Sequence, residues 1–473
     1  MNSKLIVILG SGESGTGAAL LAKHLGFEVF VSDKGIIADK YKAKLNSEKI
    51  SFEEGTHTES KILSASEIIK SPGIDPKKSE IIQKAKKLKI PIIGEIEFAG
   101  RYTKGKKICI TGTDGKTTTT MLIHQILKKA GFNVQLGGNI GNSFAELVLN
   151  ELKNTSTLQN NNPFKHEHLN TLTPEHIYYV LEISSFMLDD MYEFKADIGV
   201  LTNISTDHLD RYDYKIDNYV DSKFRIIQNM DAQCTFIYGI DSPFVENKLI
   251  DIETPAFELP FSIFPDEFDG ACGDENSITI QINDKEDVIN IEKAKLKGPH
   301  NVYNMMAAAL VAKRLEIKNE IIEQTFIDFE PAPHRMQFAG NINGIQFIND
   351  SKATTVNAAK YALSTYSSII WVAGGVDKGN NYADLKDVVK GRVKALICLG
   401  KDNEKLKKSF KGTIPNIIET QSVQEVIAQS LELGKNGDTV LLSPCCASFD
   451  LFKNYEDRGN QFMEAVKTKL TTF

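Results

Sequence analysis

The 473-residue chain has no long hydrophobic run and no excess of basic residues. No 18-residue apolar stretch occurs, and the short apolar segment near the N-terminus leads directly into Gly10, so we predict neither a transmembrane helix nor a signal peptide. Lys and Arg total 55 against 62 acidic residues, a net charge of −7 that disfavours nucleic acid or an acidic membrane as partner. We therefore expect a cytoplasmic protein that neither inserts into a membrane nor binds nucleic acid.

Cysteine is also scarce. Six cysteines are scattered over the chain, which is typical of reduced cytosolic thiols rather than a disulfide framework. Cys445 and Cys446 are adjacent, but no second pair or nearby His accompanies them. We predict that they are packed small residues.

The order of apolar runs predicts an α/β fold of three domains, because this length exceeds one hydrophobic core. We expect a Rossmann-like domain over 1–100, a central P-loop domain over 101–332 and a second Rossmann-like domain over 333–473, with a hinge near 94–101. Two stretches differ from the pattern. Residues 257–291 alternate like antiparallel strands, and polar residues 150–174, with His166 and His168, resemble an exposed insertion loop.

The most informative stretch is an apolar strand that runs through Gly112-Thr113-Asp114-Gly115 into Lys116-Thr117-Thr118 at the start of a helix. Small residues let backbone N–H groups surround a polyphosphate, Lys116 can reach its oxygens, and Thr117 can ligate Mg²⁺. Ile110 occupies the position of the usual first Gly. The stretch predicts binding of ATP or GTP.

A second glycine-rich turn lies near the N-terminus. Gly10 to Gly17 follows the first strand, and Asp33 ends the second strand at the distance of a Rossmann ribose-binding acid. This turn indicates a nucleotide diphosphate and leaves NAD open as an alternative.

Polar residues follow neighbouring strands of the central domain: the P-loop, Glu182 before Ser184, and residues 203–210. Ligands of an open parallel sheet bind outside the carboxyl ends of its strands. We therefore expect these three loops to share one crevice.

Seven short motifs, in order along essentially the whole chain, resemble those of the Mur ligases of peptidoglycan synthesis. They are Ser71-Pro72-Gly73-Ile74, Gly112-Thr113-Asp114-Gly115-Lys116-Thr117, Gly138-Asn139-Ile140-Gly141, Glu182-Ile183-Ser184-Ser185-Phe186, Asp207-His208-Leu209-Asp210-Arg211-Tyr212, Asn349-Asp350-Ser351-Lys352-Ala353-Thr354 and Ser443-Pro444-Cys445-Cys446-Ala447-Ser448. The resemblance implies a monomeric ligase that uses ATP and Mg²⁺. The last two motifs point to the member that joins D-glutamate to UDP-N-acetylmuramoyl-L-alanine through an acyl phosphate.

The resemblance also implies residue roles. Lys116, His208, Lys223 (as a carbamate) and Lys352 would be catalytic, and Thr117, Glu182, His208 and Lys223 would hold Mg²⁺. ATP would contact residues 112–118 together with Asn301, Asn304, Arg335 and Asp350. The UDP-linked substrate would contact Ser14, Gly15, Thr16, Asp33, Lys34, Ser71, Pro72, Gly73 and Asn139, and D-glutamate would contact Thr354, Lys378, Ser448, Phe449 and Tyr455.

One departure from the family pattern is Met187, where the family usually has Gln, whose hydrogen bonds Met cannot make. Two other readings stay open. One is a sister amide ligase that polyglutamylates folate, and the other is a Rossmann oxidoreductase fused to a P-loop regulator.

Overall fold

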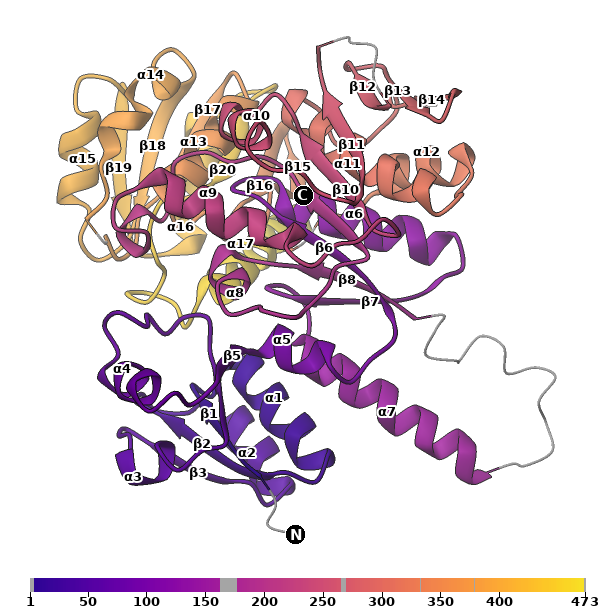
Figure 1. Ribbon diagram of the computed structural model, residues 1–473. Helices are drawn as coiled ribbons and strands as arrows, with labels where there is room; N and C mark the ends of the chain where they lie inside the picture. The colour runs from indigo at the N-terminus through magenta and orange to yellow at the C-terminus, as the bar shows by residue number, and fades with distance from the viewer. Residues whose placement is uncertain (1–3, 162–176, 265–268, 332, 378, 472–473) are drawn as a thin grey trace. The chain divides into compact units, whose positions relative to one another are not determined.

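The computed structural model describes residues 4–161, 177–264, 269–331, 333–377 and 379–471. The chain divides into two compact units, Met1–Phe329 and Glu330–Phe473 (Figure 1). The first unit contains two β-sheets and the second contains one. Mixed α/β architecture with parallel-dominated sheets confirms the predicted fold class, while the predicted domain boundaries stay predictions.

The first sheet has the order β3-β2-β1-β4-β5, and all of its strand pairs are parallel. Its central strand is buried on both faces because helices cover it, as expected for a parallel sheet. The strands are β1 (Leu5–Leu9), β2 (Glu28–Asp33), β3 (Ser51–Glu54), β4 (Glu67–Lys70) and β5 (Ile92–Gly94). The helices are α1 (Glu13–His24), α2 (Asp39–Ser47), α3 (Glu59–Ile62), α4 (Glu80–Lys87) and α5 (Glu95–Gly100).

The second sheet has the order β14-β13-β12-β11-β10-β9-β6-β8-β7. Its strands are β6 (Lys106–Thr111), β7 (Asn133–Gly138), β8 (Ile177–Glu182), β9 (Ile198–Leu201), β10 (Thr235–Gly239), β11 (Phe257–Ser262), β12 (Gly270–Gly273), β13 (Ser277–Ile282) and β14 (Lys285–Asn290). The expected antiparallel region is only partly correct. β11 runs parallel to both of its neighbours, and α10 (Pro243–Leu249) supplies the crossover between β10 and β11. Among the described strands of this sheet, β12, β13 and β14 alone pair antiparallel.

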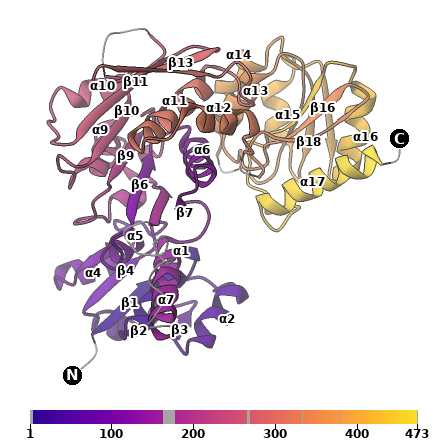
Figure 2. The same cartoon turned by 90° about the vertical axis from the view of Figure 1, so that its right-hand side faces the viewer.

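The helices of this region include α6 (Lys116–Lys129), α8 (Ser185–Leu188), α9 (Ile216–Phe224), α11 (Pro299–Arg314) and α12 (Asn319–Asp328); α6 packs against α11 and α12 (Figure 2). The loop predicted from residue 150 is wrong up to residue 161, because α7 spans Phe144–Asn161. Its first turns bury Phe144 and Val148, and this packing overrides the weak helix propensity of the polar residues that follow. His166 and His168 lie outside the described residues.

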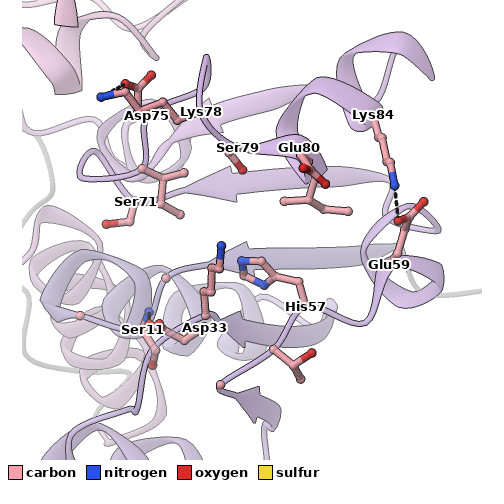
Figure 3. A pocket seen from close by; sticks show the side chains of 17 residues that line it. Ser11, Asp33, His57, Glu59, Ser71, Asp75, Lys78, Ser79, Glu80 and Lys84 are labelled. Carbon is pink, nitrogen blue, oxygen red and sulfur yellow. Dashed lines mark hydrogen bonds and ion pairs between the residues drawn. The ribbon is translucent and has the colours of Figure 1, made fainter. Parts of the chain in front are cut away.

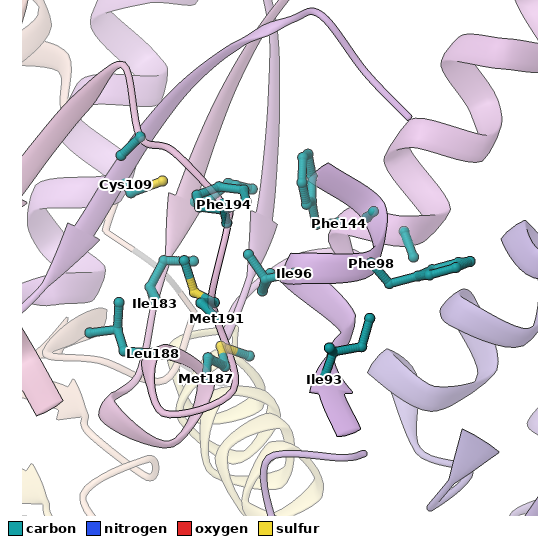
Figure 4. Packing of buried hydrophobic residues seen from close by; sticks show 14 of the residues in the cluster. Ile93, Ile96, Phe98, Cys109, Phe144, Ile183, Met187, Leu188, Met191 and Phe194 are labelled. Atoms are coloured by element: carbon teal, nitrogen blue, oxygen red, sulfur yellow. The ribbon is translucent and has the colours of Figure 1, made fainter. Parts of the chain in front are cut away.

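A continuous hydrophobic core joins the two sheets of the first unit. Ile96 and Phe98 of α5 belong to the same cluster of buried residues as Phe144 and Phe194 of the neighbouring region (Figure 4). Phe98 and Phe144 are fully buried, and the Phe144 and Phe194 rings meet edge to face with centroids 6.2 Å apart. The segment predicted as a hinge is thus a helix embedded in a shared core.

The second unit contains one sheet of order β15-β16-β20-β17-β18-β19, antiparallel only between its first two strands. Its strands are β15 (Gln337–Ile342), β16 (Ile345–Asn349), β17 (Ile369–Ala373), β18 (Val393–Leu399), β19 (Asn416–Thr420) and β20 (Thr439–Leu442), and its helices are α13 (Val356–Thr365), α14 (Lys386–Val389), α15 (Glu404–Phe410), α16 (Val423–Leu433) and α17 (Tyr455–Leu470). Trp371, the sole tryptophan, is fully buried on β17.

All six cysteines are free thiols, and Cys445 and Cys446 are buried, as the sequence predicted. Burial raises the pKa of both thiols. None of the helices within the described ranges is long and apolar enough to span a membrane.

Candidate functional site

The P-loop between β6 and α6 depends on two glycines. Gly112 has φ 145°, and a Cβ there would lie 1.9 Å from Thr202 Oγ1. Gly115 precedes α6 with φ 80°, a left-handed conformation that other residues adopt at a cost. The loop therefore turns sharply, and the first N–H groups of α6 are directed at its concave side, where an anion would bind.

The three strand-end loops meet, as predicted. Thr117 Oγ1 donates a hydrogen bond of 2.6 Å to Glu182 Oε2, and Asn139 Nδ2 donates one of 2.7 Å to Glu182 Oε1. The N–H of Asp114 donates to Asn203 Oδ1. The buried Glu182 carboxylate is thus held between the P-loop and β7, and it faces the hydroxyl that a P-loop offers to Mg²⁺.

Thr117 and Glu182 together form an oxygen-donor set that fits Mg²⁺, which keeps several waters and needs few protein ligands. No cluster of three or more His, Cys, Asp or Glu that could hold a metal occurs within the described part of the chain. The residues present therefore fit a magnesium ion bound largely through water and phosphate, and they do not form a closed protein cage.

Two lysines lie at the same loop. Lys116 Nζ donates to the carbonyls of Gly112 (2.9 Å) and Thr113 (2.6 Å), and Lys223 Nζ donates to Gly112 O (2.7 Å) and to Thr111 Oγ1 (3.2 Å). Lys223 is 1% exposed. Burial lowers the pKa of Lys223 well below its usual range, and the positive charge of Lys116 lowers it further.

His208 lies on an exposed turn beside this site. It has a left-handed backbone with φ 52° and precedes a short 3-10 helix, Leu209–Arg211. Its ring centroid is 5.0 Å from that of Phe186 and 6.5 Å from that of Tyr219. Burial of the ring by these neighbours lowers the pKa of His208, so the neutral imidazole that metals bind is favoured.

Asn301 and Asn304 share one face of α11. Asn304 Nδ2 donates to Asn301 Oδ1 (3.2 Å), while Asn304 Oδ1 accepts from Thr119 Oγ1 (3.1 Å). A Cβ at Gly115 would lie 2.3 Å from Asn304 Oδ1. The structure thus places Asn304 directly against the P-loop.

A cavity of about 750 Å³ opens at the carboxyl edge of the first sheet (Figure 3). Of the residues predicted to bind the UDP-linked substrate, Asp33, Lys34 and Ser71 line it. The Asp33 carboxylate accepts hydrogen bonds from the N–H groups of Ser11 (2.6 Å) and Gly35 (2.8 Å), which shapes the cavity wall.

Other predicted residues lie elsewhere. Pro72 and Gly73 are outside the cavity lining, as are Ser14, Gly15 and Thr16 at the start of α1. Gly15 lets α1 approach β1, since a Cβ there would lie 1.9 Å from Gly10 O. Asn139 follows β7 of the second sheet, where its side chain donates to Glu182.

Sequence reasoning missed several residues that line this cavity, namely Ser11, Thr56, His57, Lys78 and Lys84. His57 Nδ1 lies 2.7 Å from Ser32 Oγ, so the ring is fixed at the cavity wall. Burial lowers the pKa of His57. Thr56 and His57 follow β3, whose short half-exposed strand gave no apolar signal; the rule that loops follow parallel strands at one edge would have indicated them.

In the second unit the motif that follows β16 is buried. Asp350 Oδ2 accepts from Ser443 Oγ (2.9 Å), and Oδ1 accepts from the N–H of Met336 (3.3 Å). Burial raises the pKa of Asp350 to about 7. Arg335 lies close enough to lower that pKa electrostatically, so Arg335 and Asp350 are neighbours, as their assigned nucleotide role requires.

The predicted D-glutamate residues are only partly gathered. Lys352 Nζ lies over the Tyr455 ring, 5.6 Å from its centroid. Ser448 is buried, whereas Phe449 is 68% exposed and Thr354 is partly exposed. Lys378 lies outside the described residues.

Arg458 is a buried residue next to the predicted site motifs that the sequence did not indicate. It is 1% exposed, and its guanidinium donates to Ser351 O (2.9 Å), Ser351 Oγ (3.0 Å), Cys446 O (3.2 Å) and Gly374 O (3.4 Å). It therefore joins the loops that follow β16, β17 and β20. Burial lowers the pKa of Arg458 to about 10, so it stays charged at neutral pH.

Comparison with known proteins agrees with this geometry. Family models described as MurD N-terminal domain, Mur ligase middle domain and Mur ligase, glutamate ligase domain match residues 5–81, 110–312 and 334–446. The UDP-N-acetylmuramoylalanine–D-glutamate ligase of Christiangramia forsetii is 45% identical over 98% of this chain and 99% of its own length. The chain belongs to the Mur ligase family. The Porphyromonas gingivalis protein of the same name is 46% identical over 98% of each chain.

Solved structures place the fold of this Mur ligase among those of other members. UDP-N-acetylmuramate–alanine ligase MurC from Thermotoga maritima superposes with a TM-score of 0.59 at 16% identity, covering 98% of this chain and 99% of that one. MurF ligase from Thermotoga maritima in complex with ADP has a TM-score of 0.55 at 14% identity, covering 93% and 95%. At such identities the likeness concerns the fold alone.

Proposed function

We propose that this Mur ligase catalyses the ATP-dependent addition of D-glutamate to UDP-N-acetylmuramoyl-L-alanine, a step of peptidoglycan precursor synthesis. The observation that carries the proposal is the identity of about 45% to ligases of that name, which extends over 98% of this chain and 99% of theirs. The P-loop edge supplies residues suited to phosphoryl transfer, and the first sheet supplies a cavity suited to a nucleotide. A cytoplasmic location follows from where ATP and such precursors are found.

The chemistry explains why ATP is needed. A carboxylate does not form an amide at neutral pH, because oxide is a poor leaving group. The L-alanyl carboxylate oxygen attacks the γ-phosphorus of ATP, the bond to ADP breaks, and an acyl phosphate forms. The D-glutamate amine then attacks the acyl carbon, and the amide forms as phosphate leaves and the nitrogen loses a proton. Catalysis is mainly positioning of substrates and neutralisation of phosphate charge.

We assign the ATP phosphates to the P-loop N–H groups and Lys116, and the adenosine end to Asn301 and Asn304. Residues Thr113, Asp114 and Thr118 complete the loop. Asn304 is suited to this role because it is buried against Gly115 and so has one fixed orientation. Arg335, Asp350 and Lys352 of the second unit would complete the nucleotide site, and this part of the assignment rests on the family resemblance.

Thr117 and Glu182 would hold Mg²⁺, with His208 and Lys223 as the ligands of a second ion. Bound Mg²⁺ would neutralise phosphate charge. The low pKa of buried Lys223 supports carbamylation, because only a neutral amine reacts with CO₂. The resulting carbamate would replace the neutral amine with an anion next to Lys116, with release of a proton.

The cavity of the first sheet would hold the UDP moiety, with Asp33, Lys34 and Ser71 at its wall. D-glutamate would bind the second unit near Thr354, Ser448 and Tyr455, with Lys378 and Phe449 as further contacts expected from the resemblance. We retain 1–100, 101–332 and 333–473 as domain boundaries, and a monomer as the oligomeric state.

The test is phosphate release from ATP with Mg²⁺ and UDP-N-acetylmuramoyl-L-alanine, using a panel of D- and L-amino acids. We expect release only when both the UDP-linked substrate and D-glutamate are present. Equal turnover with L-glutamate would contradict the stereochemical assignment, and turnover with a folate acceptor would favour the sister ligase. Tight NAD(H) binding without ligation would favour the oxidoreductase.

A further inference from the structure

The turn that carries His208 is tied to the first sheet by Arg211. Arg211 Nε lies 3.9 Å from Asp75 Oδ2, and both side chains are about 15% exposed. The N–H of Arg211 donates to His208 O (2.9 Å), closing the turn. Arg211 thus connects a residue of the first sheet's last loops with the turn beside the P-loop.

Asp75 lies between two cavities. It lines the 750 Å³ cavity proposed for the UDP moiety, and it also lines a second cavity of about 450 Å³ together with Arg211. Its Oδ2 is 3.8 Å from Nζ of Lys78, a 76% exposed residue that also lines the first cavity (Figure 3). Asp75 therefore has two cationic partners, one facing the nucleotide cavity and one on the His208 turn.

Arg211 also touches the ring that supports His208. Its guanidinium carbon lies 4.4 Å from the centroid of the Phe186 ring, and this ring in turn lies 5.0 Å from that of His208. Phe186 belongs to α8, which begins three residues after Glu182. One cation therefore contacts both the turn that carries His208 and the helix that follows the Glu182 strand.

We propose that Arg211 is a positioning residue that couples occupancy of the UDP cavity to the placement of the His208 turn at the ATP site. A diphosphate in the cavity attracts Lys78 away from Asp75. The Asp75 carboxylate then pairs more completely with Arg211, and the turn is held against Phe186. On this proposal the turn has one position held against Phe186 and one released from it, and the bound diphosphate favours the first. A ligand can shift an equilibrium between two states only when it interacts differently with them. The inference rests on the proposed function.

A second ion pair joins the same segments and provides a matched control. Lys77 Nζ lies 2.6 Å from Asp213 Oδ1, but both side chains are more than half exposed. Exposed pairs contribute little because water and salt screen them. If tethering alone mattered, Lys77 and Arg211 would be interchangeable, whereas the proposal assigns the coupling to Arg211.

The experiment measures binding of a non-hydrolysable ATP analogue with Mg²⁺ by calorimetry, with and without saturating UDP-N-acetylmuramoyl-L-alanine. For the unmodified protein we expect the UDP-linked substrate to tighten analogue binding about fivefold or more, the usual scale of such coupling. In Arg211→Met and in Asp75→Asn the ratio should fall to near one. The double variant should show no further loss, because both changes break one contact. Lys77→Met should keep the full ratio.

Three outcomes would overturn the proposal. They are an unchanged ratio in Arg211→Met, an equal loss in Lys77→Met, and a ratio near one in the unmodified protein. Arg211→Lys keeps the charge but loses the planar group over Phe186, so we expect an intermediate ratio. This variant replaces Arg211→Met in the experiment if Arg211→Met does not fold. Absence of any UDP-substrate binding to the unmodified protein would instead contradict the proposed function.

Discussion

Burial changes the protonation of two basic residues, one in each unit, to very different extents. Lys223 at the P-loop and Arg458 at the edge of the last sheet are each 1% exposed, and both donate to backbone carbonyls. Burial and Lys116 drive the pKa of Lys223 far down, whereas the pKa of Arg458 falls only to about 10. An amine can give up its proton and become a nucleophile, while a guanidinium stays a cation. The same degree of burial therefore favours a neutral, nucleophilic amine at Lys223. It leaves Arg458 a charged donor that holds three loops together.

The largest effect is expected from removing the cation next to Lys223. Lys116→Ala should reduce ligation about a hundred- to a thousand-fold, because it removes preorganised positive charge from the γ-phosphate. Calorimetric titration should show unchanged binding of the UDP-linked substrate, since its cavity lies at the other sheet. Loss of that binding would mean that the sites are not divided between the sheets as proposed.

Lys223→Ala should lose most activity, about a hundredfold, and should recover part of it in acetate, which returns a carboxylate to the site. Lys223→Arg should be equally poor and should not recover, because a guanidinium cannot carry a carbamate. Lys215→Ala, at an exposed position just before the same helix, is the control. Full activity of Lys223→Arg would contradict the proposed carbamate. It would also contradict the proposed difference between Lys223 and Arg458.

Arg458→Met should destabilise the second unit by about 3 kcal/mol, because several buried carbonyls lose their donor. Urea unfolding followed by the fluorescence of Trp371 reports this unit, since the indole N–H donates to Ser443 O in its core. Arg392→Met, which removes an exposed guanidinium that bonds Tyr366 O, should change stability far less. Equal destabilisation by the two substitutions would contradict the proposal that buried Arg458 stabilises the second unit.

The smallest effect concerns Asp350, whose pKa burial raises to about 7. The folded state binds the proton more tightly than the unfolded state, so this group makes stability fall as pH rises from about 4 to 7. Asp350→Asn should remove that dependence. Relative to the unmodified protein it should gain about 2 kcal/mol between pH 5 and pH 8.

Trp371 fluorescence again provides the measurement, and Asp402→Asn, at an exposed position of the same unit, should show no such gain. A pH profile of Asp350→Asn parallel to that of the unmodified protein would show that Asp350 is ionised throughout this range.

How well the sequence anticipated the structure depended on how strongly each element is buried. β1 and β20 are buried and rich in aliphatic residues, and such apolar runs indicate strands in the sequence. β3 and β19, with their half-exposed residues, gave no comparable signal. α7 was missed in part because polar residues make up its C-terminal half, whereas its first turns bury Phe144 and Val148.

At the site, residues adjacent to a strand end or a glycine turn were predictable from the chain alone, as with Lys116, Thr117 and Glu182. Lys223 required the family resemblance, because a lysine on a helix is usually solvated. Arg458 was missed for the same reason, since in Asp457-Arg458-Gly459 nothing local indicates burial. The long-range packing that buries both cations is absent from any local pattern.

The P-loop lysine is bonded to the loop that carries it. Lys116 bonds two carbonyls of the loop that it serves, so an incoming phosphate replaces existing hydrogen bonds rather than adding new ones. Under the proposed function, the exchange would return little energy for a bound triphosphate and more as charge is redistributed in the transition state of phosphoryl transfer. It would then favour catalytic rate over nucleotide affinity, because an interaction that strengthens only as the reaction proceeds lowers its barrier.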